Sequence, residues 1–263
     1  LLIGGTTRAA TVTGTTWSYT LVAADITAMG QGAETITATQ TDVAGNVSAS
    51  ASKTITVNTN APSAPVINTI AGNDIINSSE QSSVITGTNE AGATVSLLIG
   101  GTTRAATVTG TTWSYTLVAA DITAMGQGAE TITATQTDVA GNVSASASKT
   151  ITVDTNAPSA PVINTIAGND IINSSEQSSV ITGTNEAGAT VSLSIGGTTR
   201  AATVTGTTWS YTLVAADITA MGQGAETITA TQTDVAGNVS ASASKTITVD
   251  TNAPSAPVIN TIA

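Results

Sequence analysis

The side chains that could do chemistry in this chain are mainly carboxylates, because its 263 residues include 17 Asp and Glu but no His and no Cys. Without His or Cys, neither a Ser-His-Asp nor a Cys-His catalytic set can form, and a thiolate metal site is excluded. Carboxylate and carbonyl oxygens are the ligands that Ca²⁺ prefers, and it takes roughly six to eight of them. Calcium binding is therefore the first chemistry to consider.

The carboxylates recur because the whole chain repeats with a period of 96 residues, from Leu1 to Leu97 and from Leu97 to Leu193. Only two positions of the repeat vary, and they are Leu2/Leu98/Ser194 and Asn58/Asp154/Asp250. A long fixed period predicts an array of similar modules, for which length or stiffness is a more usual purpose than catalysis. The expected divisions are a partial module at 1–60, complete modules at 61–156 and 157–252, and the first strand of a further module at 253–263.

Alternating apolar and polar residues in the module 61–156 predict about seven strands, with a short helical turn at 119–125. The expected strands are 64–71, 83–88, 93–99, 104–109, 112–118, 130–138 and 143–153. Seven short strands in about a hundred residues are typical of an immunoglobulin-like β-sandwich. The fold class is therefore all-β, as tandem Ig-like modules. The short, proline-tipped linker 154–158 favours an extended rod.

The composition excludes two classes of partner. The net charge is −11 with only six Lys and Arg, which argues against nucleic acid and against anionic membrane surfaces. No apolar run has the length of a membrane span, so no membrane insertion is expected in this segment.

The sandwich topology predicts where the acids lie. Asp74, Glu80, Asp121 and Asp154 are expected at the C-terminal pole of the module, whereas Glu90 and Asp138 are expected at the opposite pole. When two modules stack, Asp154 would face Glu186 and Asp234 of the next module, with Asp121 and Asp74 nearby.

Several carboxylates that converge without Lys or Arg repel one another, and Ca²⁺ would relieve the repulsion. Asn142, Asn156 and loop carbonyls are expected to complete the ligand shell. The alternative interpretation is that these residues are ordinary solvated loop acids.

Three other features have a structural and a functional interpretation. An outward ladder at Thr131, Thr133, Thr135 and Thr137 would suit ice or ordered water, but more often it is a solvent-facing strand surface. Trp113 and Tyr115 could stack on a sugar, but their inward parity favours the core. Lys149 could form an isopeptide crosslink, but a strand-end lysine that extends outward is favoured.

Three segments together resemble the bacterial Ig-like repeats of giant surface adhesins, the biofilm-associated and RTX-type proteins exported by type I secretion. The segments are Thr137 to Ser144, Val153 to Pro158 and Gly183 to Val191. The resemblance implies an extracellular stalk of tandem sandwiches with Ca²⁺ bound at the joints. It identifies Asp154 and Asp250 as linker acids, and Asp42, Asp138 and Asp234 as loop acids.

These observations predict a non-enzymatic extender that projects an adhesive tip from a bacterial surface. Its partners would be neighbouring modules, and a host or surface ligand bound by domains outside this chain. The alternatives are modules that bind carbohydrate or associate laterally into an extracellular fibre, and an accessory module of a glycan-active enzyme. Because Asn58 replaces the linker acid, the first joint is expected to bind calcium more weakly than the second and to bend more when calcium is limiting.

Overall fold

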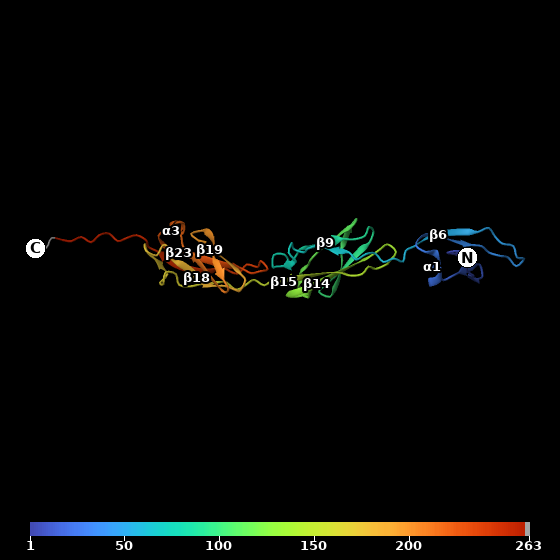
Figure 1. The fold of residues 1–263 in the computed structure, drawn as a ribbon, viewed down its shortest axis with the longest axis horizontal. Coiled ribbons are helices and arrows are strands. Elements are labelled where there is room, and N and C mark those ends of the chain that lie inside the picture. Colours follow the sequence, from blue (N-terminus) through green and yellow to red (C-terminus); the bar gives the residue numbers. More distant parts are fainter. Residues whose placement is uncertain (261–263) are drawn as a thin grey trace.

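The computed structural model describes residues 1–260 and arranges them as three modules that follow one another in a line (Figure 1). We call them module 1 (residues 1–57), module 2 (64–153) and module 3 (160–249). Residues 250–260 extend away from module 3 without forming a strand. They include part of the expected first strand at 253–263, the rest of which lies outside the described residues.

Module 2 is a sandwich of two β-sheets. The five-stranded sheet has the order β11-β10-β14-β15-β8, and the four-stranded sheet has the order β12-β13-β9-β7. The strands are β7 (Val66–Ile67), β8 (Ile75–Ile76), β9 (Val84–Thr88), β10 (Thr94–Ile99), β11 (Thr102–Ala105), β12 (Thr107–Thr109), β13 (Thr112–Thr116), β14 (Gly128–Thr137) and β15 (Ala147–Val153). The one helix, α2 (Ala119–Met125), coincides with the helical turn expected from the sequence.

The core lies between the two sheets and follows the period-two pattern of the strands. On β14, Ile132 and Ala134 are buried, while the threonines between them face outward. Trp113 of β13 is buried with Leu117 in the same apolar cluster, so its ring is not available to a sugar. These side chains confirm the inward and outward faces expected for the strands.

Module 2 has nine strands instead of seven, because β8 forms after the expected strand 64–71 and the expected strand 104–109 divides into β11 and β12. After β7 the chain turns through positive φ angles at Ala71 and Asp74, and β8 then pairs in parallel with β15 in the other sheet. The expected strand 104–109 also changes sheet at Ala106, between β11 and β12. Alternation of residue type cannot reveal the crossing at Ala106, because the less exposed positions keep the same parity on both sides of it.

Gly87 shows how closely β7, β9 and β13 pack. A Cβ atom at this position would lie 1.8 Å from the Val66 carbonyl oxygen and 2.5 Å from Trp113 Cε2. Only glycine therefore fits between the Trp113 ring and the neighbouring strand.

Module 3 repeats the architecture of module 2, as expected for sequences that differ only at Leu98/Ser194. Its elements are β16 (Val162–Ile163), β17 (Ile171–Ile172), β18 (Val180–Thr184), β19 (Thr190–Ile195), β20 (Thr198–Ala201), β21 (Thr203–Thr205), β22 (Thr208–Thr212), α3 (Ala215–Met221), β23 (Gly224–Thr233) and β24 (Ala243–Val249).

Module 1 has one four-stranded sheet, β2-β1-β5-β6, and the hairpin β3-β4. Its elements are β1 (Leu2–Ile3), β2 (Thr6–Thr7), β3 (Thr11–Thr13), β4 (Thr16–Ser18), α1 (Ala23–Met29), β5 (Gly32–Ala38) and β6 (Ala51–Val57). Across the described residues, no helix has the length and hydropathy needed to cross a membrane.

Candidate functional site at the module joints

The linker between modules 2 and 3 is fixed at both of its ends. Gln127 of module 2 holds Thr155 through two hydrogen bonds, one from Gln127 Nε2 to Thr155 Oγ1 (2.8 Å) and one from the Thr155 amide to Gln127 Oε1 (2.9 Å). Gln232 of module 3 donates from Nε2 to the Ser159 carbonyl oxygen. Pro158 and Pro161 are buried beside this contact. The linker is thus held to both modules, as the proline-tipped sequence predicts.

The loop at 138–142 is shaped by its own acid. Asp138 Oδ1 accepts hydrogen bonds from the backbone amides of Ala140 (2.9 Å) and Asn142 (2.8 Å), and Oδ2 accepts one from Asn142 Nδ2 (2.9 Å). The Asn142 side chain, with the backbone amides of the loop, lowers the pKa of Asp138 and outweighs the opposing effect of burial. The same bonds form around Asp42 in module 1, so the loop shape is intrinsic to the repeat.

The first joint brings this loop of module 2 against the end of module 1. Asn142 Nδ2 donates to the Asn58 carbonyl oxygen (3.0 Å), and Asn58 Nδ2 donates to Asp138 Oδ2 (2.9 Å). The linker position and the loop acid are therefore in direct contact across the joint.

The second joint repeats the backbone contact, with Asn238 Nδ2 donating to the Asp154 carbonyl oxygen (2.8 Å). Module 2 adds two further bonds, from Asn77 Nδ2 to the Ala236 carbonyl oxygen (3.1 Å) and from the Ser78 amide to Asn238 Oδ1 (2.8 Å). Asn238 is only 1% exposed as a result. Residues 77 and 78 were not anticipated from the sequence, because they are uncharged and 159 or 160 residues from their partners.

The carboxylates of Asp154 and Asp234 have no Lys or Arg partner among the described residues. Burial acts to raise the pKa of Asp234, but hydrogen bonds from the Asn238 side chain and from loop amides outweigh it and lower the pKa. The Asp234 carboxylate is therefore charged at neutral pH. Within residues 1–260, three or more acidic side chains do not gather at one point. Besides Asp234, the joint presents the Asn238 side chain and the carbonyl oxygens of Asp154 and Ala236, which are oxygen ligands of the kind that Ca²⁺ accepts.

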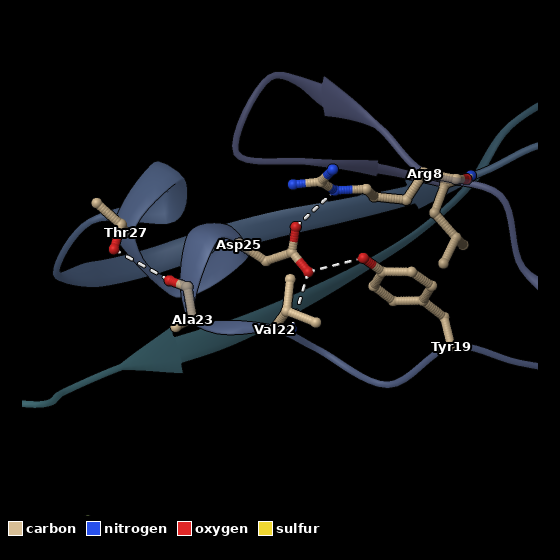
Figure 2. Close-up of polar contacts among 7 residues, drawn as sticks. Arg8, Tyr19, Val22, Ala23, Asp25 and Thr27 are labelled. Atoms are coloured by element: carbon tan, nitrogen blue, oxygen red, sulfur yellow. Dashed lines mark hydrogen bonds and ion pairs between the residues drawn. The ribbon is translucent and has the colours of Figure 1, made fainter.

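Asp121 does not belong to the joint, contrary to the expectation from the sequence. Its side chain is fully buried within module 2, where Oδ1 accepts from Arg104 Nε (2.8 Å) and Oδ2 accepts from the Tyr115 hydroxyl (2.8 Å) and the Val118 amide (3.0 Å). Figure 2 shows the same contacts in module 1, around Asp25. Asp121 is the third residue of α2, from which a carboxylate caps the amide that precedes the helix.

Asp74 lies at the expected end of the module but already has a cation partner. Its Oδ2 forms an ion pair with Lys149 Nζ (2.7 Å), and its Oδ1 accepts from the Ile70 amide (2.9 Å). The Lys149 contact, followed by the Ile70 amide, lowers the pKa of Asp74. The expectation that the acids converge without Lys or Arg is therefore wrong for Asp74 and Asp121. Asp74 holds the turn that carries the chain from β7 to β8, and it engages Lys149 as a charged pair.

The remaining candidate ligands lie around the joints without converging. Glu80 accepts a hydrogen bond from the Asn77 amide, close to the second joint. Glu90 and Glu186 are exposed in the turns after β9 and β18, and their backbone amides are bound by Gln136 and Gln232. Asn156 is exposed, and its amide donates to Asp154 Oδ1 (3.2 Å). Asp250 is exposed beyond β24.

The buried acids make stability depend on pH. Burial would raise the pKa of Asp121, but the Val118 amide, the Tyr115 hydroxyl and Arg104 together lower it below the ordinary value. A lowered folded-state pKa contributes stability that is present above the unfolded pKa, about 3.9, and is lost as the pH falls through the folded-state pKa. We expect urea unfolding midpoints to decrease steadily below about pH 5. Tyr115→Phe removes one donor and should weaken this dependence in module 2. A midpoint that stays constant down to pH 3 would contradict the assignment.

The chain belongs to the bacterial Ig-like domain family, which matches residues 68–155 and 164–251. This membership confirms the family and the fold class that the sequence predicts. A search of curated proteins gives no match.

Many solved structures are similar to the chain. One, from a study of the host cell surface retention of a 1.5-MDa bacterial ice-binding adhesin, is 27% identical with a TM-score of 0.48, covering 95% of this chain and 85% of its own. The fibronectin(III)-like modules of Clostridium thermocellum CbhA are 13% identical with a TM-score of 0.42, and the match covers 71% of this chain and 95% of the other. The BSP domain of a biofilm associated protein is 18% identical with a TM-score of 0.25, and the match covers 73% of this chain and 30% of the other.

Proposed function

We propose that this chain is an extender segment of a bacterial cell-surface adhesin, a non-enzymatic stalk that holds a distal ligand-binding tip away from the cell. The observation that carries the proposal is the fixed linker, because Gln127 and Gln232 hold its two ends to successive modules. Flexible tethers between modules have no such contacts. Membership of the bacterial Ig-like family supports a structural role, and without His or Cys a Ser-His-Asp or Cys-His catalytic set cannot form.

Calcium at the second joint is part of this proposal. Asn58 reaches the loop acid of the next module, and Asp154 occupies the same position of the repeat in the second joint. By analogy, Asp154 would bring a second carboxylate towards Asp234, and neither acid has a Lys or Arg partner among the described residues. A Ca²⁺ ion held by these two acids and nearby carbonyls would bind module 2 to module 3. The stalk would then stiffen outside the cell, where calcium is abundant.

Small-angle X-ray scattering of the chain in calcium tests the stalk. At roughly 40 Å per module, we expect a maximum dimension of about 120 Å and a radius of gyration near 35 Å. If the 263 residues instead formed one compact globule, the radius of gyration would be near 18 Å, and that value would rule the stalk out. The mass obtained from the same data tests the alternative function, because lateral association into fibres would at least double it.

A further inference from the structure

The first joint contains a hydrogen bond from Asn58, whose place in the repeat is taken in the second joint by the acid Asp154. Asn58 Nδ2 donates to Asp138 Oδ2 at 2.9 Å. We infer that this amide closes the first joint directly and takes the place of a cation there. The chain would then combine one calcium-independent joint with one calcium-dependent joint. The contrast rests on the calcium site proposed for the second joint.

The two joints differ here in side chain but not in backbone position. The Asn58 carbonyl oxygen accepts from Asn142 Nδ2 at 3.0 Å, and the Asp154 carbonyl oxygen accepts from Asn238 Nδ2 at 2.8 Å. The residue at this place in the repeat is thus anchored to the same loop asparagine in both joints. The change from Asn to Asp alters only what the side chain offers to the loop acid.

The contact at Asp138 leaves little capacity for a metal ion. A carboxylate has about four lone-pair sites. Those of Asp138 accept from two backbone amides, from Asn142 Nδ2 and from Asn58 Nδ2. A cation would have to displace at least one of these donors, and it would find a neutral amide where the second joint has a carboxylate.

The charges of the two joints lead to the same conclusion. An amide donor on a carboxylate makes a charge-assisted hydrogen bond, which is attractive without any ion. Two facing carboxylates repel until a cation lies between them. Removing calcium should therefore loosen the second joint and leave the first unchanged. This outcome differs from the expectation, based on the sequence alone, that the first joint bends more when calcium is limiting.

Spin-label distance measurements on the whole chain can test the inference, because the chain has no native cysteine. One labelled pair, at Ser52 and Thr131, spans the first joint, and the equivalent pair, at Ser148 and Thr227, spans the second. All four positions are exposed. We expect the first pair to give the same distance distribution in EDTA and in excess CaCl₂. The distance distribution of the second pair should be broad in EDTA and narrow in calcium.

Exchanging the two residues provides controls within each joint. Asn58→Asp should broaden the first distribution in EDTA and make it narrow on addition of calcium, whereas Asp154→Asn should remove the response of the second. If the wild-type first joint responds to calcium as strongly as its Asn58→Asp variant, the inference is overturned. If the second joint does not respond to calcium, the calcium proposal is the part that fails. In that case, broadening by Asn58→Asp in EDTA still supports the hydrogen bond, and an unchanged distribution refutes it.

Discussion

Replacing Asp121 by alanine is expected to destabilise module 2 by about 3 kcal/mol, and to lower its melting temperature by more than about 10 °C. The substitution leaves the Arg104 guanidinium, the Tyr115 hydroxyl and the Val118 amide without their common acceptor. Arg104 is partly exposed and regains water, which keeps the loss below that of a fully buried pair. Most of the lost stability comes from the Tyr115 hydroxyl and the Val118 amide, because the Asp121 side chain that accepts their hydrogen bonds is completely buried.

Scanning calorimetry can measure this effect, because module 3 is an internal reference of nearly identical sequence. Asp121→Ala should move one transition to lower temperature and leave the transition of module 3 in place. Asp121→Asn keeps the shape and one acceptor, so its shift should be smaller. The exposed Asp250→Ala should change stability by less than about 0.5 kcal/mol. Equal shifts for the Asp121→Ala and Asp250→Ala variants would show that the buried contacts do not stabilise the module.

The sheet pattern could be predicted from the sequence because each strand buries alternate residues. Ile132 and Ala134 are inward, and Ala119–Met125 is helical, as the residue pattern indicates. The two changes of sheet could not be predicted in the same way. The first depends on positive φ angles at Ala71 and Asp74 and on parallel pairing of β8 with β15, and the second occurs at Ala106, within one continuous alternating segment.

The candidate site was predicted less completely, because a carboxylate in a loop does not reveal its partner. Asp121 and Arg104 are 17 residues apart on different elements, and only the fold brings them together. One signal was available, since Asp at the third position of a short helix often caps the preceding amide. The glutamines that hold the linker carry no charge and gave no signal in a search for metal ligands. The sequence predicts that the linker residue faces the loop acid of the next module, but it did not reveal the hydrogen bond between Asn58 and Asp138, because Asn58 was considered only as a weaker calcium ligand.

Removing calcium is expected to lower the stability of the second joint by about 2.7 kcal/mol. This value applies when the free calcium concentration before removal is about a hundredfold above the dissociation constant. An ion that binds only the folded joint stabilises it by this mass-action term, and EDTA abolishes the term. For modules of this size, the melting temperature should fall by roughly 10 °C or more. Calorimetry of the whole chain in calcium and in EDTA measures the difference.

Two substitutions that each remove one negative charge locate the ion. Asp154→Asn removes the linker acid of the second joint, so we expect most of the calcium-dependent increase in melting temperature to disappear. In EDTA this variant should melt at or above the wild-type temperature, because it removes the repulsion from Asp234. Asp250→Asn makes the same change at an exposed residue beyond β24, and it should keep the full calcium effect. An identical response to calcium in all three chains would place the ion away from Asp154, since the linker acid would then contribute nothing to its binding.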